Sequence, residues 1–345
     1  MHGTIYEFAK LPGLGRGGAP ASSAGVTRPR KVRAVPLVGI IRNPRSHRNK
    51  GQAAELADCS NILTETPATR AALVDTLAEF HRRGIDYLAV DGGDGTVRDV
   101  LTCGAAIFGD NWPDLIVLPK GKTNALAVDL GLPANWTLQE ALEAASRGRG
   151  ITRHPIRVTP ASGEACVQGF ILGAGVFTLA TKTGQEAHRW GAFNSLAVGL
   201  TVLWSIICAF GPKGNRWRGL TPMRLRMPRG GKELSHSRHG QRGERFLLVA
   251  ASFEKFPAGV RPFGPNPGPG MKVLVLDAPV RWMLALMPMF LAGSMARVFE
   301  RGGVHRFVAE EVEADLGGSF ILDGEEFPGG RYRLESGPLL NFIVP

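Results

Sequence analysis

The sequence predicts an α/β N-terminal domain built on a parallel sheet, followed by a β-rich sandwich domain that carries apolar helices. The chain has 345 residues, of which 44% are hydrophobic, enough for two cores of ordinary size. Up to about Gly150, short apolar runs alternate with amphipathic stretches, which favours a parallel sheet covered by helices. After that point, β-like runs are separated by Gly- and Pro-rich loops, as in antiparallel sandwiches. We therefore expect a basic flexible tail over residues 1–34 and domains over 35–150 and 151–345, with the last segment packing back on the first domain.

The composition limits the partners. A formal net charge of +11 and a pI near 10.0 indicate an anionic partner such as nucleotide phosphates, nucleic acid or an acidic membrane surface. We expect no nucleic acid, because the chain has neither an aromatic stacking platform nor a recognised binding motif. The four cysteines are widely spaced without a CxxC pair, which predicts a reducing compartment and no zinc site. The tail lacks the apolar core of a secretory signal.

Sequence patterns in the first domain predict the order of its elements. Apolar runs predict strands at residues 34–41, 61–66, 87–90 and 115–119. An amphipathic stretch predicts a helix over 69–84, with Leu73, Leu77 and Phe80 on one face and Gly84 as its C-cap. Further helices are expected after the glycines of the third strand, around 123–133, and over 137–148.

In the second domain, β-like runs predict strands at 165–172, 223–227, 245–252, 271–276, 319–324 and 331–336. Two apolar segments interrupt them. Residues 193–210 carry no charge, and three alternatives stay open for them: a transmembrane span, a buried helix, or a helix at the membrane interface. Residues 282–295 are interrupted by Pro288, and their methionines suit either core packing or an adaptable apolar surface.

The stretch GGDGT, which follows the third predicted strand, indicates a phosphate site. Glycines at the carboxyl end of a parallel strand let backbone N–H groups approach phosphate oxygens, and the next helix offers its N-terminus. A structural turn would need no acid. A carboxylate there is costly unless it holds a metal or accepts a proton, so Asp94 is a candidate for one of these roles.

Two more donor-rich turns follow predicted strands of the same sheet. KGKTNALA begins at Lys120 and offers Lys122, Thr123 and Asn124 as phosphate donors. A Walker A loop is excluded, because Ile116 stands where that motif needs glycine. RNPRSHRNKG follows the first strand. Each turn alone fits a solvated loop, but three such turns on one sheet edge fit a nucleotide better.

Late in the chain, FILDGEEFPGG groups Asp323, Glu325 and Glu326 in a turn. A DG pair between two strands is the common hairpin signal, which gives the turn a structural explanation. The functional alternative is that these acids hold Mg²⁺ or take a hydroxyl proton during phosphoryl transfer.

Taken together, these motifs resemble the catalytic family of diacylglycerol, sphingosine and ceramide kinases over roughly 35–345. The resemblance is carried by NPRS, by Thr64 after the second strand, by GGDGTVRDV, by LPKGKTNALAVDLGLP and by DGE. GGDGT alone is shared with NAD kinases. RNPRSHRN and PKGKTNALA look closest to bacterial ceramide kinases.

The resemblance implies a fold like that of NAD and diacylglycerol kinases, with ATP and Mg²⁺ as cofactors. It implies that Asp94 or Glu325 is the base and that Asp323 is the metal ligand, and the sequence does not decide between the two bases. The nucleotide-binding residues that it implies are Asn43, Ser46, Thr64, Gly92, Gly93, Gly95, Thr96, Gly121, Lys122, Thr123 and Asn124. The sequence departs from the family pattern in three places: Lys122 replaces a threonine, Ala125 replaces a common aspartate, and Pro269 and Gly270 stand where the family usually has an aspartate before a strand.

We therefore expect an ATP-dependent lipid kinase that phosphorylates the primary hydroxyl of a membrane lipid, with ceramide favoured over diacylglycerol. The expected location is the cytoplasm, with peripheral association at the inner face of the cytoplasmic membrane through its anionic surface. The alternatives are a diacylglycerol kinase, an NAD-kinase-like enzyme, and a non-catalytic lipid-binding protein.

Overall fold

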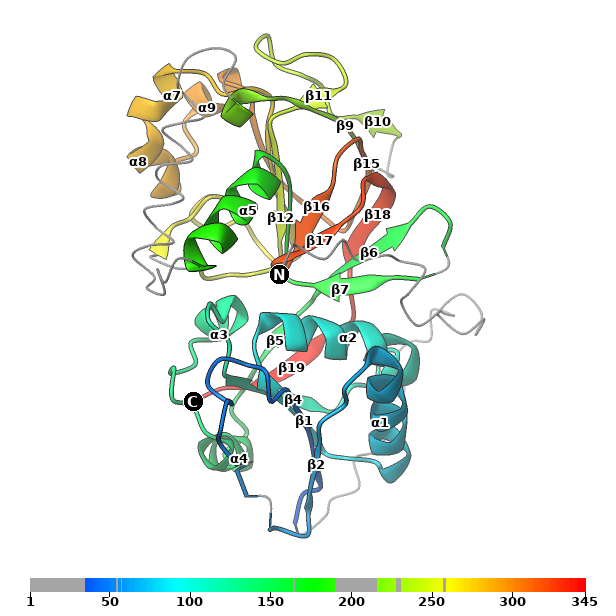
Figure 1. Cartoon of the computed structure of the whole chain (residues 1–345). Coiled ribbons are helices and arrows are strands. Elements are labelled where there is room, and N and C mark those ends of the chain that lie inside the picture. Colours follow the sequence, from blue (N-terminus) through cyan, green and yellow to red (C-terminus); the bar gives the residue numbers. More distant parts are fainter. Residues whose placement is uncertain are drawn as a thin grey trace. The chain divides into compact units, whose positions relative to one another are not determined.

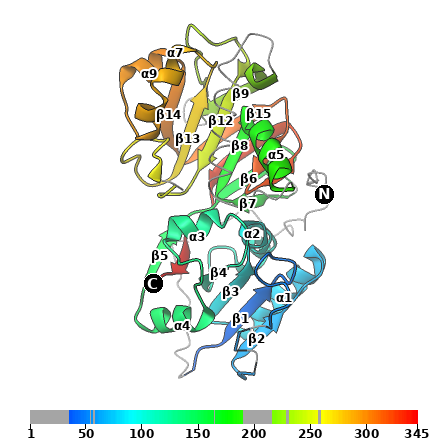
Figure 2. The ribbon, with the colours of Figure 1, turned by 60° about the vertical axis from the view of Figure 1, so that its left-hand side comes forward.

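The computed structural model describes residues 35–345 except 54, 57, 164, 190–215, 228–230 and 257–258. The predicted tail and the apolar segment 193–210 lie outside the described residues. The chain divides into two compact units, whose elements are labelled in Figure 1 and seen from a second side in Figure 2. The α/β unit holds residues up to Pro155, Gly163–Gly169 and Gly337–Pro345. The β-rich unit holds Ile156–Ser162 and Phe170–Ser336.

The sheet of the α/β unit has the strand order β2-β1-β3-β4-β19-β5. Its strands are β1 (Val38–Arg42), β2 (Ile62–Glu65), β3 (Tyr87–Gly92), β4 (Asp114–Pro119), β5 (Gly150–Arg153) and β19 (Leu340–Ile343). Strands β1 to β4 pair in parallel, which confirms the predicted parallel sheet. Every residue of β1 and β4 is buried, as expected for strands covered on both faces.

The helices of this unit are α1 (Arg70–Arg83), α2 (Asp94–Phe108), α3 (Ala125–Leu130) and α4 (Leu138–Ser146). The prediction for α1 is confirmed: its N-cap Thr69 accepts a hydrogen bond from Ala72 N at 3.2 Å, and Gly84 ends it in the left-handed conformation with φ 66°. The buried face of α1 packs closely on β1. A Cβ on Gly39 would lie 2.6 Å from the Phe80 ring, so this contact requires glycine.

The β-rich unit contains two antiparallel sheets, with strand orders β10-β9-β15-β18-β6 and β14-β13-β12-β8-β16-β17, and β11 pairs with β9. Its strands are β6 (Ile156–Pro160), β8 (Ile171–Gly175), β9 (Thr221–Met227), β10 (Lys232–Glu233), β11 (Glu244–Arg245), β12 (Leu247–Ala251), β13 (Met271–Leu276), β14 (Val304–Ala309), β15 (Glu311–Leu316), β16 (Phe320–Leu322), β17 (Glu325–Phe327) and β18 (Gly330–Ser336). The short strand β7 (Val167–Gly169) belongs to the α/β unit, where Gln168 N donates to Thr102 Oγ1 of α2 at 3.1 Å.

The helices of the β-rich unit are α5 (Val176–Arg189), the 3₁₀ turn η2 (Arg216–Arg218), α7 (Trp282–Ala285), α8 (Met287–Leu291) and α9 (Arg297–Arg301). Pro288 lies in the first turn of α8, where a missing backbone N–H costs nothing, so the apolar segment 282–295 folds as two short helices. None of the helices among the described residues is long and apolar enough to cross a membrane.

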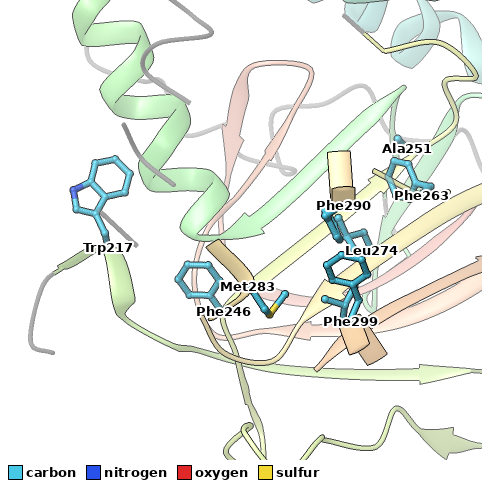
Figure 3. Close-up of a cluster of buried hydrophobic side chains, with 9 residues drawn as sticks. Trp217, Phe246, Ala251, Phe263, Leu274, Met283, Phe290 and Phe299 are labelled. Atoms are coloured by element: carbon cyan, nitrogen blue, oxygen red, sulfur yellow. The ribbon is translucent and has the colours of Figure 1, made fainter. Parts of the chain in front are cut away.

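A cluster of buried apolar side chains anchors these short helices (Figure 3). Met283, Phe290 and Phe299 of α7, α8 and α9 join Leu274 of β13 in this cluster. The Phe290 and Phe299 rings meet edge-on, with centroids 5.4 Å apart. Burial of these rings therefore holds three helices of four or five residues, which would not be stable alone.

Candidate active site

Three loops converge at the carboxyl edge of the parallel sheet, where β1, β3 and β4 end. Arg48 N in the loop after β1 donates to Lys120 O at 3.1 Å, and Lys120 N donates to Gly92 O at 3.0 Å. Asn43 Nδ2 donates to Thr96 Oγ1 at 3.0 Å. Backbone and side-chain hydrogen bonds thus tie the NPRS, GGDGT and KGKTN loops into one surface, at the sheet edge where α/β proteins bind ligands.

Close backbone approach explains two of the glycines in these loops. A Cβ on Gly121 would lie 2.7 Å from the Cα of Gly93, and one on Gly93 would lie 2.9 Å from the Cα of Gly121. Asn124 adopts a left-handed conformation with φ 49°, and its side chain accepts from Gly121 N at 2.8 Å. The KGKTN loop is therefore fixed by its own asparagine, and the GGDGT loop packs directly against it.

Asp94 connects two helices. Its carboxylate accepts hydrogen bonds from Ala125 N at 2.8 Å and from Leu126 N at 3.2 Å, so the first residue of α2 caps the N-terminus of α3. Burial raises the pKa of the Asp94 carboxyl above its usual value, and the two backbone hydrogen bonds oppose that shift. The group is therefore held in one orientation and takes up a proton more readily than a solvated aspartate.

A cavity of about 400 Å³ opens beside these loops within the α/β unit. This volume is typical of small-molecule sites. It is lined by Ile41, Arg42, Asn43, Pro44, Arg45, Thr66, Pro67, Ala68, Thr69, Arg70, Leu73, Thr96 and Asp99. Asn43 and Thr96 were expected at the site from the sequence. Arg45, Thr66 and Arg70 were not singled out, although Thr66 lies in the short connection between β2 and α1 and Arg70 is the first residue of α1.

The other residues expected to bind the nucleotide differ in their solvent exposure and in their hydrogen bonds. Ser46 belongs to the turn after β1, and its N–H donates to Asn43 O at 3.1 Å. The Thr64 hydroxyl of β2 is buried and finds no hydrogen-bond partner within the described part of the chain. Lys122 and Thr123 are exposed in the KGKTN loop. Gly95 lies in the first turn of α2.

Sequence patterns did not predict a buried polar network that lies beneath the loops. Asp91, the residue before GGDGT, forms an ion pair with Arg42 at 3.0 Å and accepts from Asn49 Nδ2 at 3.0 Å. Asn49 Nδ2 also reaches Asn43 O at 3.0 Å. Burial raises the pKa of Asp91, and Asn49 and Arg42 oppose the shift. The sequence held one signal for this network: Asp91 and Arg42 each directly follow an apolar run and precede a candidate loop.

Asp323 and Glu325 lie in the β-rich unit, at the hairpin predicted between β16 and β17. Asp323 and Gly324 both have positive φ, 45° and 83°, as the tight hairpin turn requires. The Asp323 carboxylate accepts from Phe170 N and Ile171 N at 3.0 to 3.1 Å. Glu325 begins β17 and is partly buried. Across the described residues, no group of three or more His, Cys, Asp or Glu side chains is placed to hold a metal ion.

Residues 38–158 match the family model of the diacylglycerol kinase catalytic domain. A diacylglycerol kinase of Bacillus subtilis (strain 168) is 32% identical over 165 residues, which cover 43% of this chain and 52% of the relative. A probable lipid kinase YegS of Shigella flexneri is 29% identical over 108 residues, covering 31% and 34%. The chain thus spans about a third to a half of the length of these curated relatives.

The fold has a solved counterpart. A diacylglycerol kinase from Bacillus anthracis str. Sterne superposes with a TM-score of 0.58 at 14% identity, over 90% of this chain and 97% of that one. At this identity the likeness concerns the fold alone. The matched segment contains the NPRS, GGDGT and KGKTN loops and the cavity beside them. The similarity to the diacylglycerol kinase catalytic domain therefore extends over residues 38–158.

Proposed function

We propose that the protein is an ATP-dependent lipid kinase, which transfers the γ-phosphoryl group to the primary hydroxyl of a membrane lipid. The observation that carries this proposal is the convergence of three donor-bearing loops beside a cavity of about 400 Å³ at the carboxyl edge of the sheet. The relatives described as a lipid kinase and a diacylglycerol kinase support it. We favour ceramide over diacylglycerol as the acceptor, because the RNPRSHRN and PKGKTNALA segments resemble those of bacterial ceramide kinases.

In this proposal the phosphates of ATP lie on the glycine loops, where N–H groups and the N-terminus of α2 favour negative charge. The residues assigned to the nucleotide are Asn43, Ser46, Thr64, Gly92, Gly93, Gly95, Thr96, Gly121, Lys122, Thr123 and Asn124. Arg45 and Arg70 line the cavity, where Arg70 pairs with Asp99 at 3.5 Å. The Thr64 hydroxyl is buried without a partner among the described residues and does not line the cavity, so its assignment rests on the resemblance.

The proposed reaction is a single displacement. The lipid hydroxyl oxygen bonds to the γ-phosphorus, the bond from that phosphorus to the β–γ bridging oxygen breaks, and ADP leaves. The hydroxyl proton passes to Asp94 or Glu325. Asp94 is preorganised by the Ala125 and Leu126 amides, and its raised pKa suits a proton acceptor.

Mg²⁺ is the proposed metal, and it would neutralise charge on the transferring phosphates. The described residues contain no cluster of three or more ligating side chains. They therefore suit a Mg²⁺ ion held jointly by the protein and the ATP phosphates better than one held by protein side chains alone. Mg²⁺ commonly keeps waters and takes one or two carboxylates in addition to phosphates. Asp323 is the proposed carboxylate, and three hydrogen bonds from backbone amides hold it in one orientation.

A lipid acceptor implies work at a membrane, so we propose peripheral association with the inner face of the cytoplasmic membrane. Phosphorylation of diacylglycerol instead of ceramide is the nearest alternative, and the Bacillus subtilis relative favours it. An NAD-kinase-like enzyme and a non-catalytic lipid-binding protein are the other two.

Transfer of labelled γ-phosphate tests these alternatives together. ATP is offered with mixed micelles containing ceramide, diacylglycerol or sphingosine, and separately with NAD, to the wild type, Asp94→Asn and Glu325→Gln. Glu313→Gln is the matched control, since Glu313 is an exposed acid of β15. We expect a labelled lipid, and a loss of about 10²- to 10⁴-fold in kcat for the variant that lacks the base.

The pH profile separates a base from a residue that only positions α3. If Asp94 accepts the proton, activity falls as the pH drops through its raised pKa, and the residual activity of Asp94→Asn lacks that acid limb. Label on NAD alone would support the NAD-kinase alternative. ATP binding without any labelled product would support the non-catalytic one.

A further inference from the structure

The helices α7 and α8 and the connection from α8 to α9 expose large apolar side chains on the outside of the β-rich unit. Trp282, Met289 and Met295 have exposed fractions of 36%, 40% and 51%. They belong to a run of uncharged residues, 282–296. The inward side chains of the same segment, Met283 and Phe290, are buried in the cluster of Figure 3, so the outward ones are not needed for that core. We call this surface, formed by residues 282–296, the apolar patch.

Exposed arginines flank the apolar patch at both ends. Arg281 precedes Trp282, and Arg297 and Arg301 lie on α9. None of the three forms an ion pair with another described residue. Glu300 is the single acid between residues 281 and 301, so the segment carries a net positive charge. Apolar side chains bordered by unpaired arginines match an anionic interface with an apolar interior.

Arg306 of β14 adds a cation that packs on two buried aromatic rings beneath this surface. Its guanidinium carbon lies 4.1 Å from the centroid of the Phe290 ring and 5.6 Å from that of Phe299. Its Nη1 donates to Ser294 O at 2.6 Å, whereas Nε and Nη2 are buried and have no hydrogen-bond partner within the described residues. Burial lowers the pKa of Arg306 to about 10, so it stays charged at neutral pH.

Arg306 also lines a small pocket of about 30 Å³ with Met295 and Phe299, and Glu300 lies at the same pocket. That volume holds one water-sized group. A phosphate oxygen at this point would meet the guanidinium, and the Glu300 carboxylate would oppose it.

We propose that the apolar patch, with Arg306, docks the protein on bilayers that contain anionic phospholipids. Trp282, Met289 and Met295 enter the interface, and the arginines contact lipid phosphates. A second copy of the chain is a poorer occupant, because a symmetric contact would bring Arg281, Arg297 and Arg301 toward their own counterparts. This inference deepens the proposed function, since a lipid kinase must reach an acceptor within a bilayer. The biological role of the docking rests on the proposed function, but the docking itself does not.

Vesicle flotation tests the docking surface without using the reaction. The full chain is mixed with phosphatidylcholine vesicles, with or without phosphatidylglycerol, in the absence of ATP, ceramide and diacylglycerol. The test variants are Met289→Ser/Met295→Ser, Arg297→Glu/Arg301→Glu and Glu300→Gln. The matched controls are Val128→Ser/Leu339→Ser, two exposed apolar residues of the α/β unit, and Arg149→Glu/Arg242→Glu, which changes the net charge equally.

We expect the wild type to float with the anionic vesicles, more weakly at high salt. Both double test variants should lower the apparent affinity by at least about tenfold, since each removes two contacts with the interface. Glu300→Gln should raise it, and both controls should bind as the wild type does.

Wild-type binding by the test variants, or an equal loss in the controls, would overturn the proposal. A concentration-dependent dimer that Met289→Ser/Met295→Ser abolishes, with no vesicle binding, would assign the patch to a second copy. Because the vesicles contain no acceptor, patch-dependent binding by a protein that phosphorylates no lipid would refute the kinase proposal and leave the docking surface standing.

Discussion

At the scale of single residues, the physical reason for glycine differs among the three glycine positions of GGDGT. A Cβ on Gly92 would lie 2.5 Å from Thr96 Oγ1, and one on Gly93 would lie 2.9 Å from the Cα of Gly121. A Cβ on Gly95 would meet nothing nearer than Arg98 Nη2 at 3.7 Å, an ordinary contact. The folded chain therefore gives no steric reason for glycine at position 95, and a bound phosphate would give one.

Gly95→Ala should separate folding from nucleotide binding. We expect its free energy of unfolding to stay within about 1 kcal/mol of the wild type, because alanine suits a helix better than glycine does. Its affinity for ATP should fall at least about tenfold, because the methyl group occupies the proposed phosphate cradle. Urea unfolding and calorimetric titration with ATP measure the two effects, and Gly121→Ala, which clashes with backbone, is the destabilised comparison. Unchanged ATP affinity would argue against phosphate at Gly95.

At the scale of elements, one buried carboxylate joins three strands of the β-rich unit. Asp277 follows β13, is fully buried, and pairs with Arg245 of β11. It also contacts His305 Nε2 of β14 at 3.1 Å and accepts from Ser237 N at 2.6 Å. Burial alone would raise the pKa of Asp277, but the hydrogen bonds from His305 and Ser237 and the charges of His305 and Arg245 lower it to about 2.

The stability supplied by Asp277 should depend on pH in a defined direction. Its folded pKa lies below the ordinary value of 3.8, so the contribution is complete above about pH 4 and is lost as the pH falls toward about 2. The gap in unfolding free energy between the wild type and Asp277→Asn should shrink by about 2 kcal/mol over that range. Urea unfolding at a series of pH values measures it. Asp315→Asn, which breaks an exposed pair with Arg331, should show no such change, and a constant gap for Asp277→Asn would contradict the assignment.

At the scale of the whole molecule, the chain closes the sheet of its first unit with its last strand. β19 pairs in parallel with β4 and antiparallel with β5, although more than half of the chain separates it from β4. Leu340 and Phe342 are fully buried there. The sheet of the α/β unit is therefore complete only once residues 340–343 have been made.

Phe342→Ala should destabilise the α/β unit by about 3–5 kcal/mol through loss of a buried aromatic ring. Amides of β4 and β5 should then exchange faster with deuterated solvent, while those of β12 and β13 keep wild-type protection. The neighbouring Leu339→Ala is the control, since Leu339 is 56% exposed. Hydrogen exchange read by mass spectrometry measures both, and equal acceleration in β13 would show that the units do not respond separately.

Local pattern predicted much of the fold. The amphipathic spacing of Leu73, Leu77 and Phe80, the cap at Gly84 and the apolar runs of β1, β3 and β4 specify α1 and the parallel strands, because period and capping are properties of neighbouring residues. The DG pair likewise predicted the hairpin between β16 and β17. The loops of the candidate site could be located because each directly follows an apolar strand.

The sequence by itself determined β1 to β4 and α1 to α4 of the first unit, the family resemblance, and the three loops that carry candidate phosphate donors. Only the tertiary structure decided which residues meet: that Asp94 caps α3, that Asp91, Arg42 and Asn49 form a buried network, and that β19 lies between β4 and β5. It also decided that Met289 and Met295 are exposed while Phe290 is buried. The physical reason is that burial and long-range pairing depend on residues that are distant in the sequence and that only the fold brings into contact, so the local sequence does not specify them.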